Sequence, residues 1–113
     1  MTQSTHVEIV DVTARDGLQN ESRLFATTEK LELITRALEA GFKRLEVTSF
    51  AHPKYIPQMA DAEAVIEQLP DRSDVTYIGL AMNERGVDRA LKTTIDEIGL
   101  VVVATNSLSL IHI

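Results

Sequence analysis

The sequence contains no cysteine, which excludes a disulfide framework and a thiolate metal site. Basic residues are also scarce, because 11 Lys and Arg stand against 17 Asp and Glu and leave a formal net charge of −6. Nonspecific binding to nucleic acid or to an anionic membrane surface requires a basic patch. We therefore expect neither a nucleic acid nor a membrane as a partner.

Long hydrophobic runs are missing as well. The longest, from Ile98 to Ala104, is interrupted by Gly99 and is far shorter than the ~20 residues of a transmembrane helix. The first residues carry no basic stretch followed by an apolar core, so no secretory signal is visible. With 44% hydrophobic and 25% charged residues, the composition is that of a soluble globular protein, and we expect a cytoplasmic one.

Apolar, β-branched runs alternate along the chain with segments of helical periodicity. The expected strands lie at 7–12, 44–48, 75–80 and 97–104, and the expected helices at 27–41, 60–69 and from 83 onward. The first strand reads as buried, since four of its six residues are apolar and β-branched. Short connections between alternating strands and helices favour parallel strands joined by crossover helices.

The ends of the helices carry recognisable signals. Thr27 and Asn83 are expected to cap the amino ends of the first and third helices, and Gly41 fits a left-handed end of the first. The apolar face of the first helix is built on residues such as Leu31 and Ile34. Lys30 is expected to lie off that face.

A faint internal repeat bears on the fold class. Residues 37–47 can be laid over residues 90–100, each piece being a helix end, a tight turn and a strand. Thr94 stands where Gly41 stands, so that its turn is expected to differ or to be strained. The repeat, and the absence of Gly-x-Gly-x-x-Gly after the first strand, favour a TIM (β/α)8 barrel over a Rossmann sheet. We expect an α/β chain that supplies roughly the first four βα units of such a barrel.

An arginine and a carboxylate stand side by side where the first strand ends, in Arg15-Asp16-Gly17. Asp-Gly is a strong turn signal, so one interpretation is an exposed turn with a surface ion pair. The alternative is a functional site, because the carboxyl ends of barrel strands carry the active sites of TIM-barrel enzymes.

The longer phrase favours function. Arg15-Asp16-Gly17-Leu18-Gln19-Asn20-Glu21 resembles the 3-hydroxy-3-methylglutaryl-CoA lyase family, of the metal-dependent lyase and aldolase superfamily of TIM barrels. The resemblance covers about residues 7–107. Three further blocks support it: Ala40-Gly41-Phe42 with 45–50, Pro53 to Asp61, and Leu80-Ala81-Met82-Asn83. Thr13-Ala14 departs from the Gly-Pro often found in the family, which leaves the acyl-CoA substrate less certain than the reaction.

The resemblance implies cleavage of a tertiary β-hydroxy acyl-CoA to acetyl-CoA and a keto acid, with Mg²⁺ or Mn²⁺ as cofactor. Asp16 matches the metal-ligating aspartate. Arg15 matches the arginine that pairs with the thioester oxygen, and Glu46 matches a functional glutamate that fixes Arg15. Gln19 is expected to orient substrate and Ser49 to contact it. The family acts in the breakdown of leucine or related branched acids, and we expect a homo-oligomeric parent.

The family completes its metal site with a His-x-His pair and an Asn from later strands and uses a Cys on a mobile loop, and this sequence contains no His-x-His pair and no Cys. We therefore expect this polypeptide to be inactive by itself and the complete protein to be a lyase. Two alternatives stay open. One is a condensing relative, such as an isopropylmalate or homocitrate synthase, against which the Leu18-Gln19-Asn20-Glu21 phrase argues. The other is a non-catalytic half barrel that pairs with another chain.

The last residues, 108–113, do not continue the alternation of strands and helices. They match the translation of a transposon-end adapter common in sequencing libraries. We expect residues 1–107 to be the N-terminal part of a pyruvate-carboxyltransferase or lyase-like barrel, and 108–113 to be a non-native tail.

Overall fold

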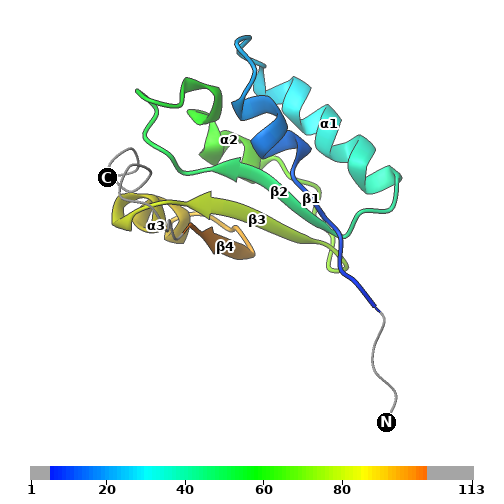
Figure 1. Ribbon diagram of the computed structural model, residues 1–113. Coiled ribbons are helices and arrows are strands. Elements are labelled where there is room, and N and C mark those ends of the chain that lie inside the picture. The colour runs from blue at the N-terminus through cyan, green and yellow to red at the C-terminus, as the bar shows by residue number, and fades with distance from the viewer. Residues whose placement is uncertain (1–5, 102–113) are drawn as a thin grey trace.

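The computed structural model describes residues 6–101, and its core is one sheet of four parallel strands. The order is β1-β2-β3-β4, so every strand lies beside its neighbour in sequence (Figure 1). A doubly wound sheet reverses this order, whereas a barrel keeps it. The predicted fold class, four consecutive βα units of a TIM barrel, is confirmed. The strands are β1 (Val10–Asp11), β2 (Arg44–Ser49), β3 (Thr76–Ala81) and β4 (Glu97–Leu100).

Three helices connect the strands. They are α1 (Thr27–Glu39), α2 (Ala62–Glu67) and α3 (Glu84–Leu91). Helices α1 and α2 pack together, α2 also contacts β2, and α3 contacts β3. A π-helical turn at Thr13–Gly17 precedes α1, and a 3₁₀ turn at Pro57–Met59 precedes α2. Within residues 6–101, no helix has the length and apolar character needed to cross a membrane.

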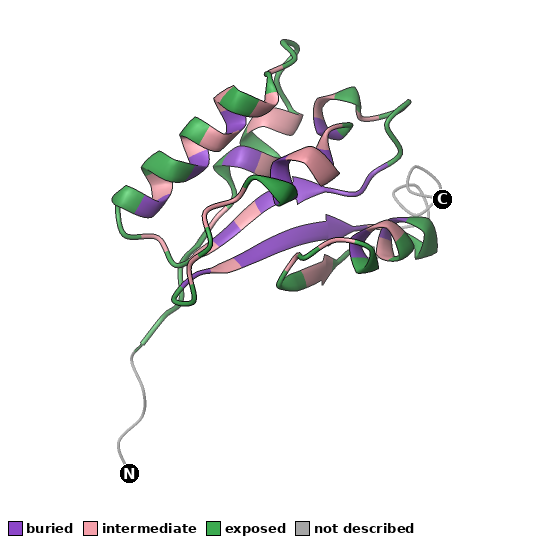
Figure 2. Ribbon diagram, turned by 180° about the vertical axis from the view of Figure 1, so that it is seen from behind, coloured by how far each residue is buried: buried purple, intermediate pink, exposed green. Residues whose placement is uncertain are grey.

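The hydrophobic core forms two adjoining clusters on which these helices rest. Strand β3 is buried along nearly its whole length, as Figure 2 shows. Leu69 and Ile95 pack against both clusters. The larger cluster is made of Ala14, Ile34, Leu38, Leu45, Val47, Val65, Val75 and Tyr77. The smaller is made of Phe50, Ala62, Ile66 and Ala90.

The helix ends confirm most of the expected signals. Gly41 has a φ of +102°, and its amide donates to the Leu38 carbonyl at 3.0 Å. Asn83 caps α3 by accepting the Gly86 amide at 2.9 Å. The turn at Thr94 differs from that at Gly41, because no non-glycine residue of the described chain has a positive φ. There the Thr93 hydroxyl donates to the Ala90 carbonyl at 2.7 Å.

Two expectations for α1 are wrong. Its cap residue is Ala26 rather than Thr27, and the Ala26 amide donates to the Glu29 carboxylate at 2.9 Å. The Thr27 hydroxyl is instead used in a contact with Asp61. Lys30 is 3% exposed and therefore lies on the buried face with Ile34. Residues four apart share a helix face, which places Lys30 beside Ile34. The charged ammonium group can be buried there because acceptors inside the fold receive its hydrogen bonds.

The opening strand is also not the buried strand that its sequence predicts. Val7 and Ile9 are 78% and 67% exposed, and the strand itself is only Val10–Asp11. It lies at the edge of the sheet and pairs with β2 alone among the described residues. Apolar, β-branched residues favour a strand, but they do not determine whether that strand is paired with another strand on both of its sides. The predicted end of the fourth strand and the expected tail at 108–113 lie outside the described residues.

Arg44 links the amino ends of the strands. Its Nη2 lies 2.7 Å from the Glu97 carboxylate on β4, and its Nε lies 3.7 Å from Glu8, just before β1. The hydrogen bond that Arg44 donates to the Glu97 carboxylate is the main cause that raises the pKa of Arg44. The side chain thus spans the sheet at the end opposite to Arg15.

A close approach of Phe50 to β3 makes Gly79 structurally important. A Cβ added at Gly79 would lie 2.5 Å from Cε2 of Phe50, which is 2% exposed. We expect Gly79→Ala to lower the free energy of unfolding by about 1–3 kcal/mol, because the ring has no space to move. Gly99→Ala is the matched control, since its Cβ would meet Leu80 at an ordinary 3.5 Å. Urea unfolding measures both, and equal effects would contradict this packing.

Candidate functional site

A π-helical turn directly after β1 positions the candidate site. The amides of Arg15, Asp16 and Gly17 all donate to the Val12 carbonyl, at 3.2, 2.8 and 3.3 Å. Ala14 is 2% exposed and belongs to the core, so a small side chain lets the turn rest on the sheet. π-helical turns are rare and are often found at functional sites. This winding brings Arg15 and Asp16 to the carboxyl end of β1.

Arg15 is joined to the neighbouring strand by an ion pair. Its Nε lies 2.7 Å from Oε1 of Glu46 on β2, and the two side chains are 15% and 17% exposed. Such a charge-assisted bond is short and directional, and partial burial reduces its screening by salt. The β2–β3 register shifts between Glu46 and Thr48, which is the irregularity that often accompanies functional sites at strand ends. The expected contact between Glu46 and Arg15 is present.

Asp16 is the most open group of the site. Its side chain is 53% exposed, and Oδ1 is 3.4 Å from Nη1 of Arg15 and 3.2 Å from Nδ2 of Asn20. Asn20 also donates to the Asp16 carbonyl at 2.9 Å, which fixes the turn. The surface ion pair of the simpler interpretation therefore exists. It is part of a wider cluster, because Arg15 binds Glu46 more closely than it binds Asp16.

The carboxylate of Asp16 has the chemistry of one ligand for a hard divalent cation. The carboxylate is exposed, and the contacts of its Oδ1 with Arg15 and Asn20 are both long. Among residues 6–101, however, no three His, Cys, Asp or Glu side chains come together as a metal-binding group. Asp16 thus fits a cation as a single protein ligand, to which other ligands must be added.

Gln19 follows the turn and carries an unsatisfied polar atom. Its Oε1 is buried and has no hydrogen-bond partner among the described residues. A buried acceptor without a donor costs about 1–3 kcal/mol, so a bound molecule that supplies a donor would remove this cost. The geometry is compatible with the predicted role of Gln19 in orienting substrate, which stays a prediction.

Ser49 ends β2 on the same edge but is differently placed. It is 0% exposed, and its hydroxyl accepts the Ala51 amide at 3.3 Å. Contact between Ser49 and substrate, which stays a prediction, would require the loop after β2 to move. His52 and Lys54 lie exposed in that loop, where Nδ1 of His52 accepts the Lys54 amide at 3.1 Å.

The sequence and the fold are both similar to those of known proteins. The family model described as HMGL-like matches residues 6–112. The chain belongs to the HMGL-like family. It is 42% identical over 91 residues to a hydroxymethylglutaryl-CoA lyase of Bacillus subtilis, which covers 80% of this chain and 30% of that relative. A Pseudomonas aeruginosa protein named 3-hydroxy-3-isohexenylglutaryl-CoA/hydroxymethylglutaryl-CoA lyase is 37% identical and covers 91% and 34%.

Solved structures agree with the family assignment. The HMG-CoA lyase of Brucella melitensis has a TM-score of 0.88 and 39% identity, covering 96% of this chain and 38% of that one. An Acinetobacter baumannii HMG-CoA lyase, solved with coenzyme A and 3-methylmalate, has a TM-score of 0.85 and 36% identity, covering 95% and 35%. The chain spans about a third of the length of the curated relatives it matches. The predicted resemblance is confirmed.

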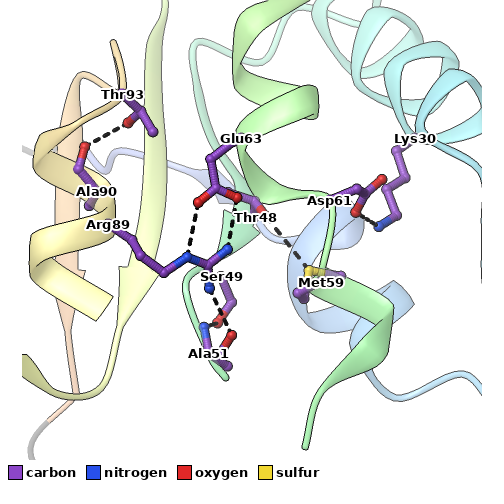
Figure 3. A network of polar contacts seen from close by, with 10 residues as sticks. All are labelled: Lys30, Thr48, Ser49, Ala51, Met59, Asp61, Glu63, Arg89, Ala90 and Thr93. Carbon is purple, nitrogen blue, oxygen red and sulfur yellow. Dashed lines mark hydrogen bonds and ion pairs between the residues drawn. The ribbon is translucent and has the colours of Figure 1, made fainter. Parts of the chain in front are cut away.

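A second ion pair borders the site in this HMGL-like chain, and sequence reasoning missed it. Arg89 on α3 binds Glu63 on α2 through two contacts of 2.9 and 2.8 Å (Figure 3). Its Nη1 also donates to the Ala51 carbonyl at 3.0 Å, and the guanidinium lies 5.7 Å from the Phe50 ring. Arg89 therefore fixes the start of the loop after β2. No local pattern indicates this pair, because its members lie 26 positions apart.

The Arg89–Glu63 pair generates a pH prediction. The hydrogen bond from Arg89 is the main cause that lowers the pKa of Glu63 from its ordinary value of 4.5. A lowered pKa stabilises the fold above 4.5, and this contribution is lost as the pH falls through the folded-state pKa. We expect Glu63→Gln to lower the free energy of unfolding by about 0.5–1 kcal/mol at pH 7, with the difference from wild type shrinking toward pH 3.

Urea unfolding at several pH values measures this difference. Glu32→Gln is the matched control, because both side chains of the Arg36–Glu32 pair are exposed, Arg36 at 73% and Glu32 at 65%. Its effect is expected to be smaller at every pH. A wild-type advantage over Glu63→Gln that stayed constant from pH 7 to pH 3 would contradict the assignment.

Proposed function

We propose that the protein containing this chain is a carbon–carbon lyase that cleaves 3-hydroxy-3-methylglutaryl-CoA, or a close acyl-CoA, to acetyl-CoA and acetoacetate. The observation that carries the proposal is the ion pair, beside Asp16, between Arg15 beyond the carboxyl end of β1 and Glu46 within the adjacent strand β2. The names of the relatives support it, as does a similar lyase solved with coenzyme A.

The chemistry explains why an arginine is needed. When the substrate hydroxyl loses its proton, its oxygen forms the ketone of acetoacetate and the adjacent carbon–carbon bond breaks. The bonding electrons pass into the acetyl thioester, whose oxygen becomes an enolate oxygen before carbon is protonated. Glu46 accepts from Nε of Arg15, and Nη1 makes a longer contact with Asp16, which leaves Nη2 to face that oxygen. A preorganised cation stabilises this charge without reorganisation.

Asp16 would hold the Mg²⁺ or Mn²⁺ ion that the family implies. When bound, such a cation stabilises negative charge on the hydroxyl and carboxylate oxygens of the substrate. One carboxylate binds a divalent cation weakly against water, so this chain by itself is proposed to be inactive. Gln19 and Ser49 are proposed to contact the acyl-CoA.

We also propose that the full-length protein is a homo-oligomer that acts in the breakdown of leucine or related branched acids. We propose a cytoplasmic location for it, although some relatives are named mitochondrial.

The test uses the full-length protein that contains this chain. It is incubated with 3-hydroxy-3-methylglutaryl-CoA, and the release of acetyl-CoA and acetoacetate is followed, before and after treatment with a chelator. We expect cleavage that stops on chelation and returns with Mg²⁺ or Mn²⁺. Condensation of acetyl-CoA with a keto acid, in place of cleavage, would identify a synthase and contradict the proposal.

A substitution at Arg15 tests its role. Arg15→Lys keeps the positive charge but removes the planar fork, so it cannot hold Glu46 and face the thioester oxygen at the same time. We expect kcat to fall by about 10²–10³-fold, the loss typical of one such electrostatic donor. Arg36→Lys, on the exposed face of α1, is the control and should leave kcat unchanged. Full activity in Arg15→Lys would remove Arg15 from the mechanism.

A further inference from the structure

Lys30 is the only charged residue of the described chain that is fully buried, at 3% exposure. Its Nζ donates to Oδ1 of Asp61 at 2.5 Å (Figure 3). It also donates to the Gln58 carbonyl at 2.5 Å. The other oxygen of Asp61 accepts the Thr27 hydroxyl at 2.6 Å. The ammonium group and the carboxylate are therefore both satisfied inside the fold. We call Lys30, Asp61 and Thr27 the Lys30 clamp.

The clamp connects two segments that leave neighbouring strands. Gln58 and Asp61 lie near the end of the β2–α2 loop, residues 50–61, and Lys30 lies on α1. The side chain of Gln58 continues the connection by donating to the Glu21 carbonyl at 2.9 Å. Glu21 belongs to the β1–α1 connection, a few residues after Arg15 and Asp16. The two loops that follow β1 and β2 are thus tied to each other and to α1.

Stability alone does not account for a buried ion pair. Removing two charges from water costs free energy that their attraction often fails to recover, so that well-packed apolar residues are frequently as stable. What the pair supplies is a fixed geometry, because the ammonium group must meet two acceptors in defined directions. Lys30 also does not contact Arg15, Asp16 or Glu46 in the structure, and its burial keeps it from reaching a ligand.

We propose that Lys30 is a positioning residue, which holds the β1–α1 and β2–α2 loops in the relation that the reaction requires. This inference rests on the proposed function. Arg89 fixes the start of the β2–α2 loop through Ala51, and Lys30 fixes its end through Gln58. Between these anchors, residues 52–55 are exposed. Loosening the second anchor displaces the site, and displacement by about 1 Å can reduce the rate 10²-fold.

The experiment compares variants of the full-length protein. Lys30→Met leaves Asp61 without its ammonium partner and is expected to unfold readily. The double variant Lys30→Met/Asp61→Leu replaces the pair by apolar side chains, which preserves folding while removing the tie. Arg36→Met, on the exposed face of the same helix, is the matched control. Gln58→Leu, which cuts only the link to Glu21, serves if both Lys30 variants fail to fold.

Two measurements decide the outcome. Hydrogen exchange is expected to accelerate at least about tenfold in residues 18–26 and 50–61 of the double variant, and to stay unchanged in the core strands. Its kcat should fall and its KM rise, together lowering kcat/KM by about 10–100-fold. A smaller folded fraction would lower kcat alone. Unchanged exchange in both loops, or a wild-type kcat/KM in a folded variant, would overturn the proposal.

Failure of the proposed function is distinguishable from failure of this inference. A wild-type protein without cleavage activity would contradict the lyase assignment. The exchange comparison needs no substrate, so it would still support or overturn the clamp.

Discussion

The guanidinium of Arg15, just beyond β1, and the carboxylate of Glu46 on β2 lie 2.7 Å apart, and the placement of the other candidate groups follows from this contact. It joins a π-helical turn to a buried strand, so the turn cannot rotate without losing a half-buried charge pair. Asp16 and Gln19 are carried on or beside the same turn. The pair therefore fixes the directions in which a cation ligand and an unsatisfied amide oxygen are presented.

Around this contact the protein uses its charges as braces between segments. Arg89 joins α3 to α2 and to the loop after β2, and Lys30 joins α1 to the other end of that loop. Arg44 joins β2 to β4 at the amino ends of the strands, opposite to the candidate site. The acidic composition is consistent with this arrangement, because each of these cations is matched by a carboxylate within the fold. Beyond the carboxyl end of β1, the carboxylate of Asp16 stays 53% exposed.

More of the fold than of the side-chain contacts could be predicted from the sequence. Alternating periodicity, Asn83 and Gly41 are local signals, and each produced the expected element or cap. The Arg15–Glu46 pair was accessible only because the motif resembles a known family. The Lys30 and Arg89 networks join residues about 30 positions apart, for which a single sequence carries no signal. The opening strand was misjudged because apolar character indicates a strand without showing how many neighbours cover it.

The most direct test of the account is a crystal structure of the full-length protein with Mn²⁺ and coenzyme A, with the metal located by its anomalous scattering. We expect one Mn²⁺ ion within bonding distance of the Asp16 carboxylate, about 2.0–2.3 Å. We also expect that Arg15 stays paired with Glu46 and faces the thiol end of the coenzyme. A Mn²⁺ ion bound elsewhere, with Asp16 facing only solvent and Arg15 turned from Glu46, would contradict this expectation.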